Sequence, residues 1–184
     1  MKTNKFLPIL LMLLVLVASC SKDDDNVVPE AVNEEEVITT MEIQLVSGTS
    51  NIILKTQDLD GDGPSAPVVT VSGNLAAGTE YLGAILVLNE LESPAEDITE
   101  EVEEEDLDHQ FFYTAGSGLD VTTAYGNFDS AGNPLGTVFQ LTTGAAGSGS
   151  FTVTLIHEPT KPNTGLASAG GETDIEATFN ITIE

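Results

Sequence analysis

The chain has 184 residues, with 30 acidic and only five basic side chains and a formal net charge of −25 at pH 7. Phosphate backbones and anionic headgroups repel such a chain, which argues against a nucleic-acid-binding protein and predicts cations as partners. The single cysteine, Cys20, excludes a disulfide within the chain.

Residues 1–19 are predicted to be a lipoprotein signal peptide. Lys2 and Lys5 precede an apolar run from Phe6 to Ala18, which is too short and wrongly flanked for an ordinary membrane span. The sequence Leu16–Cys20 resembles the lipobox of bacterial lipoproteins, in which the chain is cut before a cysteine that is then acylated. We therefore expect Cys20 to anchor the protein to the outer membrane through acyl chains.

Residues 20–35 are predicted to be the acylated cysteine and a flexible acidic tether, because charged residues, Asn and Pro outnumber large apolar ones. Asp23–Asp25 resemble the acidic export tag of surface-exposed lipoproteins of the Bacteroidota, which implies a protein facing the cell surface; the periplasmic face is the alternative. Residues 36–184 then have the size of one domain with a single core.

This domain is predicted to be mostly β, because apolar and polar residues alternate with a period of two. The C-terminal segment is the clearest case, since its odd-numbered residues from Ile175 to Ile183 are apolar. Similar segments, separated by turn sequences, lie near 41–45, 51–57, 67–72, 80–89, 111–115, 120–126, 136–142 and 151–155. Short strands with this spacing predict a single antiparallel β-sandwich with immunoglobulin-like layering.

One acidic helix is expected near 94–108. Ser93 can serve as N-cap, Pro94 suits the first helical position, and Glu96 completes a capping box. The acidic residues crowded at the other end, around Glu104 and Asp106, oppose the negative end of the helix dipole. A positive charge is therefore expected near the C-terminal end of the helix.

The two histidines are the candidate metal ligands, because each lies where an apolar stripe ends. His109 lies four residues after Glu105, and His157 is followed directly by Glu158; Asp106 is a further candidate. Mixed imidazole and carboxylate ligands suit a divalent transition metal such as zinc or copper, which would also offset the acidic helix end. The alternative is that each histidine is a residue at the core edge, hydrogen-bonded to a carbonyl or an acid.

A calcium site is a weaker prediction. Asp58, Asp60 and Asp62, followed by Gly63, match the first half of a calcium loop. The closing position of such a loop is Val69 and not glutamate, so the sequence favours a solvated hairpin turn over bound calcium.

No enzymatic activity is predicted. The chain has no Gly-x-Ser-x-Gly elbow, no phosphate-binding loop with a lysine and no arginine to hold an anionic substrate.

Several motifs together resemble a family of flavobacterial surface lipoproteins, often labelled "type 1 periplasmic binding fold" and associated with TonB-dependent receptors. Besides the lipobox these are Asp58–Gly63, Ser93–Glu101, Asp108–Phe112, His157–Pro159 and Gly170–Glu176. The family's label names a larger α/β fold, which the β pattern of this chain contradicts. The resemblance implies an outer-membrane setting beside a TonB-dependent receptor.

These observations together predict a divalent-cation-binding accessory to an outer-membrane transporter. The alternatives are a structural or adhesive surface module with no small ligand and, less favoured, haem capture between the two histidines.

Overall fold

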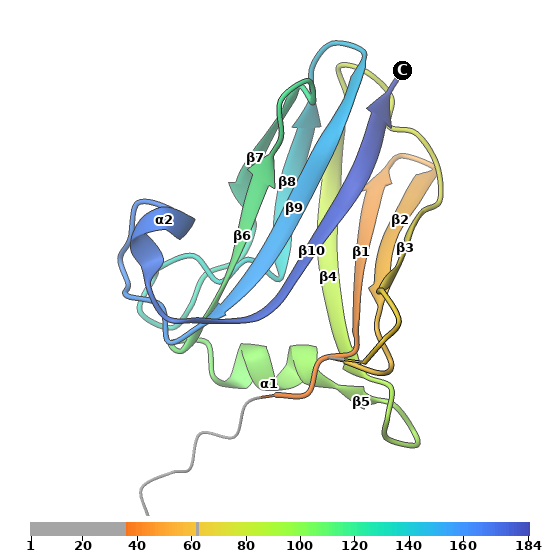
Figure 1. Cartoon of the computed structure of the whole chain (residues 1–184). Coiled ribbons are helices and arrows are strands. Elements are labelled where there is room, and N and C mark those ends of the chain that lie inside the picture. Colours follow the sequence, from red (N-terminus) through yellow and green to blue (C-terminus); the bar gives the residue numbers. More distant parts are fainter. Residues whose placement is uncertain (1–35, 62) are drawn as a thin grey trace, which may run out of the picture. The chain divides into compact units, whose positions relative to one another are not determined.

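The computed structural model describes residues 36–61 and 63–184, which fold into two antiparallel β-sheets with two short helices (Figure 1). The predicted signal peptide, the Cys20 anchor and the tether lie outside the described residues. In chain order the elements are β1 (Thr40–Ser47), β2 (Ser50–Gln57), β3 (Val68–Val71), β4 (Glu80–Asn89), β5 (Glu96–Asp97), α1 (Ile98–Glu104), β6 (His109–Ala115), β7 (Val121–Tyr125), β8 (Val138–Thr143), β9 (Gly147–His157), α2 (Leu166–Ala169) and β10 (Glu172–Ile183).

The two sheets are unequal. The larger has the strand order β3-β2-β1-β4-β8-β7, with β5 paired to the end of β4, and the smaller has the order β10-β9-β6. The sheets pack face to face with their apolar sides inward, so the prediction of a mostly β, antiparallel sandwich is confirmed. Because β1 runs antiparallel between β2 and β4, the ends of β2 and β4 lie beside the start of β1 (Figure 1).

The core follows from the alternation in the sequence. Met41, Ile43 and Leu45 of β1 have no exposed surface, and the odd-numbered residues of β9 and β10 face them across the sandwich. Residues fully buried in this layer include Phe139, Leu141, Phe151, Val153, Leu155 and Phe179. Each large apolar side chain buried in this way contributes about 1.5–3 kcal/mol of transfer free energy, so this layer holds the sheets together.

The helix is shorter than predicted. Its N-cap is Asp97 and not Ser93, because Glu96 and Asp97 pair with the end of β4 as β5. The Thr99 hydroxyl donates to the Val87 carbonyl and accepts from the Val87 N–H, which fixes the first turn against β4. Ile98 and Val102 are buried, as the apolar stripe predicts.

The end of β9 is buried on both faces, which the alternation does not predict. Ile156 and Phe112 form a second, smaller apolar cluster with Ala169 of α2. Helix α2 therefore covers the outer face of the three-stranded sheet where the two histidine-bearing strands meet. Among the described residues, neither helix is long and apolar enough to cross a bilayer.

Candidate metal centre

His109 and His157 are brought together by strand pairing. His109 is the first residue of β6 and His157 the last of β9, and the two are direct partners in the antiparallel register. Cross-strand partners on one face have Cβ atoms about 4.5–5.5 Å apart, so their side chains meet. The two ring centroids lie 4.7 Å apart, and the side chains are 0% and 6% exposed.

Asp174 reaches the histidines because β10 is irregular at this point. The register of β10 against β9 shifts between Thr173 and Ile175, leaving Asp174 as the extra residue of a bulge. Bulges redirect side chains, and here the Asp174 Oδ1 atom lies 3.7 Å from His157 Nδ1. The Asp174 side chain is 5% exposed.

Glu36 completes the group from the segment that precedes β1. Its Oε1 atom lies 3.2 Å from His109 Nε2, and its Oε2 atom lies 3.7 Å from His157 Nδ1. The Glu36 side chain is 8% exposed. Since the other three residues belong to the smaller sheet, Glu36 links the segment leading into the larger sheet to this site.

Ligand atoms of Glu36, His109, His157 and Asp174 all lie within 4.8 Å of one another, so the group can hold a metal ion. Two ligands bound at about 2.0–2.2 Å to a tetrahedral zinc lie about 3.3–3.6 Å apart. The separations of 3.2, 3.7 and 3.7 Å given above, which involve both oxygens of Glu36, come close to this spacing. The donor set is two imidazoles and two carboxylates, which suits borderline divalent cations.

The tautomer of His109 is fixed by a second contact. Its Nδ1 atom lies 3.1 Å from the backbone carbonyl oxygen of Glu105, which can only accept, so Nδ1 carries the hydrogen. In the neutral ring Nε2 then has a free lone pair, aimed at the Glu36 carboxylate. Among the described atoms, His109 Nε2 and Glu36 Oε2 are buried without a hydrogen-bond partner. Holding a ligand imidazole through its other nitrogen is how metal sites orient histidine.

Not every residue proposed from the sequence belongs to this group. The structure brings together His109 and His157, whereas Glu105 and Glu158 are exposed and lie outside the four-residue group. Glu105 contributes its backbone carbonyl in place of its carboxylate. Asp106 accepts hydrogen bonds from the Ser130 N–H and hydroxyl.

Sequence reasoning missed both carboxylates of the group. Glu36 is one of three consecutive glutamates and has no local feature that distinguishes it. For Asp174 the sequence offers one signal, the Gly170-Gly171 pair shortly before it, since glycines often mark an irregular strand start.

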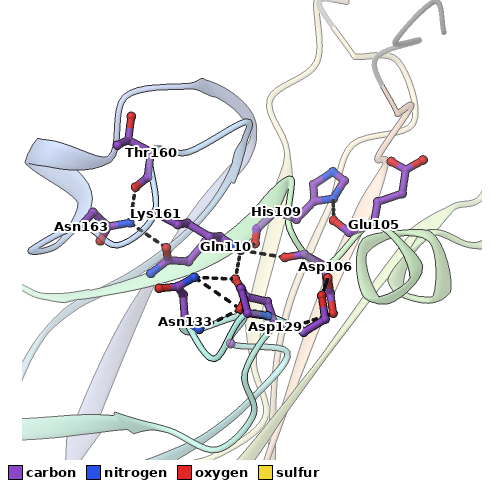
Figure 2. A network of polar contacts seen from close by, with 12 residues as sticks. Glu105, Asp106, His109, Gln110, Asp129, Asn133, Thr160, Lys161 and Asn163 are labelled. Atoms are coloured by element: carbon purple, nitrogen blue, oxygen red, sulfur yellow. Dashed lines mark hydrogen bonds and ion pairs between the residues drawn. The ribbon is translucent and has the colours of Figure 1, made fainter.

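The positive charge expected at the end of α1 is the ammonium group of Lys161 (Figure 2). Lys161 Nζ donates to the backbone carbonyls of Asp106 and His109 at 2.7 and 2.6 Å, and it lies 3.1 Å from Asp129 Oδ2. The Lys161 and Asp129 side chains are 6% and 0% exposed. A buried positive charge, paired with Asp129, therefore lies just beyond the end of the helix and beside the metal group.

Asp129 keeps its negative charge in this place. Burial on its own would raise the pKa of Asp129, but hydrogen bonds from the Asn133 N–H and from Lys161 outweigh it and lower the pKa below the ordinary 3.8. The Asp129 carboxylate also accepts from the Ala131 N–H, so its turn is rigidly tied to the lysine.

In the described residues, the predicted calcium loop is a turn whose aspartate side chains accept hydrogen bonds from its own backbone. Asp58 Oδ1 accepts from the Asp60 N–H, and Asp60 Oδ2 accepts from the Ser65 N–H, both at 3.2 Å. Asp62 lies outside the described residues. These bonds are those of the solvated hairpin turn.

No protein-family model, curated protein or solved structure matches this chain. The resemblance to flavobacterial lipoproteins therefore stays a prediction.

Proposed function

We propose that the protein binds a divalent transition metal, with zinc favoured, through Glu36, His109, His157 and Asp174. One observation carries the proposal: His109 Nε2 is buried, has no hydrogen-bond partner among the described atoms, and faces a carboxylate oxygen at 3.2 Å. A bare imidazole lone pair and a carboxylate repel each other, and a cation between them relieves this repulsion. A metal ion satisfies both ligands at once.

The donor chemistry selects among metals. Calcium and magnesium prefer oxygen ligands and more of them than this group offers. Copper(II) prefers a square-planar or tetragonal arrangement. Zinc has no d-electron preference for geometry and so accepts donors that are spread over distances of up to 4.8 Å, which supports zinc over copper.

Burial of the four side chains favours a metal-binding role over a catalytic one. All four side chains are at most 8% exposed, and four protein donors fill a tetrahedral zinc site. Catalytic zinc sites keep one position open for water or substrate. A closed site of this kind retains its metal and ties the segment before β1 to the three-stranded sheet.

The cellular role that we propose is that of a lipid-anchored outer-membrane protein facing the cell surface, as an accessory to an outer-membrane transporter. The lipobox at Cys20 and the acidic residues after it support the anchor and the surface location, and the motifs shared with flavobacterial lipoproteins support the transporter role. The closed site also supports a second candidate, a structural surface module that holds a resident metal, in contrast to the ligand-free module considered from the sequence. The rate at which bound zinc exchanges with a labelled zinc pool distinguishes the two candidate roles. A transported cation must leave within minutes, whereas a structural one need not.

Haem capture is not supported by the geometry. The two imidazole rings lie 4.7 Å apart at a tilt of 35° and are buried, so a porphyrin plane does not fit between them as they lie.

Calorimetry on the purified, chelator-stripped chain tests the proposal. We expect one zinc per chain with a dissociation constant below about 1 μM, and a stabilisation of about 2.7 kcal/mol at a free zinc concentration of 100 times that constant. Replacing a ligand in Glu36→Gln or Asp174→Asn should weaken zinc binding by about 100-fold or more.

The matched controls are Glu105→Gln and Glu158→Gln, which remove the two exposed acids suggested by the sequence alone. Both should bind zinc as tightly as the unmodified chain. If these two variants lose affinity while Glu36→Gln and Asp174→Asn keep it, the site is built from the other carboxylates. If no metal binds more tightly than about 100 μM, the proposal is wrong.

A further inference from the structure

A groove of about 360 Å³ lies at the end of the sandwich where β1 starts. Its apolar walls are Val37, Ile38, Leu59, Pro67, Leu91 and Ile175. These residues come from the segment before β1, the connection from β2 to β3, the segment after β4 and the start of β10. Volumes of about 300–1,000 Å³ are typical of small-molecule sites.

Three of the residues that line the groove have large apolar side chains that remain exposed. Val37, Leu59 and Leu91 are 55%, 49% and 60% exposed. Single exposed apolar residues are ordinary, but three that converge on one hollow from separate segments mark a binding surface.

The polar part of the groove is anionic. Asp58, Asp60 and Glu176 belong to its lining, and no lysine does. A hydrogen bond from the Ser65 N–H lowers the pKa of Asp60 below its ordinary value of 3.8, so this carboxylate is charged at neutral pH. The two lysines of the described residues, Lys55 and Lys161, are paired elsewhere with Glu90 and Asp129.

We propose that this groove binds a small amphiphilic amine, whose apolar body fills the space between Leu59, Leu91 and Ile175 and whose ammonium group meets the carboxylates. Charge complementarity selects this ligand class, because an anionic amphiphile would meet Asp58 and Asp60 without a counter-charge; the third acid, Glu176, already accepts from the Thr154 hydroxyl. A second copy of the chain is disfavoured by the same reasoning, since each copy carries a formal charge of −25.

Titration of the purified chain with n-octylammonium, octanoate and 1-octanol tests the ligand class, because the three probes share one apolar chain and differ in charge. The measurement is the dissociation constant by calorimetry at physiological salt, with the site located from amide chemical shifts. We expect octylammonium to bind at least about tenfold more tightly than either other probe, with the largest shifts at residues lining the groove.

Two leucine variants provide the matched comparison. Leu91→Lys places a positive charge in the groove, whereas Leu82→Lys makes the same change at a leucine that is 56% exposed at the opposite end of β4. Leu91→Lys should weaken octylammonium binding by at least about tenfold, and Leu82→Lys by less than about twofold. Zinc affinity should stay unchanged in both, so failure of this proposal is distinct from failure of the metal site.

Three outcomes would overturn the amine site. Equal binding of octanoate or 1-octanol would remove the charge selectivity. Equal weakening by both leucine variants would show a general charge effect. Self-association in sedimentation that Leu91→Lys abolishes would show that a second copy covers the groove.

Discussion

Replacing Lys161 by methionine should destabilise the fold by about 3–5 kcal/mol. The change keeps most of the apolar stem but removes an ammonium group that donates to two backbone carbonyls and to the Asp129 carboxylate. Hydrogen bonds to charged groups contribute about 1.5–3 kcal/mol each, and breaking a buried ion pair on one side costs about 3–5 kcal/mol. The second figure applies here, because Asp129 is fully buried and would lose its counter-charge.

The stability lost in Lys161→Met should depend on pH, in a direction set by the pKa of Asp129. The pKa of Asp129 is lowered in the folded chain, so its stabilising charge is fully present above the unfolded value near 3.8 and disappears as pH falls through the lower folded value. The difference between Lys161→Met and the unmodified chain should therefore be largest at neutral pH and shrink in acid.

Urea unfolding followed by circular dichroism measures the effect as a shift of the midpoint at constant slope. For a slope of about 2 kcal/mol/M, the expected shift is about 1.5–2.5 M. Lys55→Met is the control, because Lys55 and Glu90 are 32% and 24% exposed and such a pair contributes at most about 1 kcal/mol. If both variants lose the same stability, the buried lysine is not a stabilising element and the reasoning fails.

Other parts of the structure give further predictions. Burial raises the pKa of Tyr113 well above its ordinary 10.0 and also raises that of Tyr125, so both phenolates should appear at higher pH than that of an exposed tyrosine. Tyr113→Phe should remove the latest step and leave that of Tyr125. The fold stability linked to Tyr113 should fall as pH rises above about 10. Gly171→Ala should cost more than about 2 kcal/mol by urea unfolding and weaken zinc binding, because Gly171 has a φ of +73° and an added Cβ would lie 2.1 Å from the His157 carbonyl oxygen; unchanged stability would contradict this. Asp97→Ala removes the N-cap of α1 and should cost about 1 kcal/mol, whereas Ser93→Ala should cost little, and the reverse order would restore the cap expected from the sequence.

The strands could be predicted because their signal is local. Side chains in a strand alternate strictly between two faces, so the apolar phase of Met41 to Leu45 or Phe151 to Leu155 identifies the buried side without knowledge of the partner. The same phase places His157 on the inner face at the end of its strand. The helix ends are less local: a capping sequence at Ser93 was available, but pairing of Glu96 and Asp97 with β4 delays the first turn.

The two carboxylates of the metal group could not be predicted, because their positions depend on contacts between residues far apart in the sequence. Asp174 points at His157 because one extra residue shifts the register of β10, and Glu36 arrives from a segment far from both histidines in the sequence. Lys161 likewise reaches carbonyls 52 and 55 residues away. Among 30 acids, spacing cannot distinguish the two that converge, so proximity along the chain pointed to Glu105 and Glu158.

The position of β1 has a mechanical consequence. This strand lies between β2 and β4 and pairs antiparallel with both along nearly its whole length, and the C-terminus lies at the opposite end of the sandwich from its start (Figure 1). A pull between Glu36 and the C-terminal residue therefore acts along the strand, so its hydrogen bonds are loaded together in shear and do not open one after another. Single-molecule stretching between these two points should give a high rupture force. Bound zinc should raise it, because Glu36 is the first residue to feel the load and the metal ties it to the other sheet.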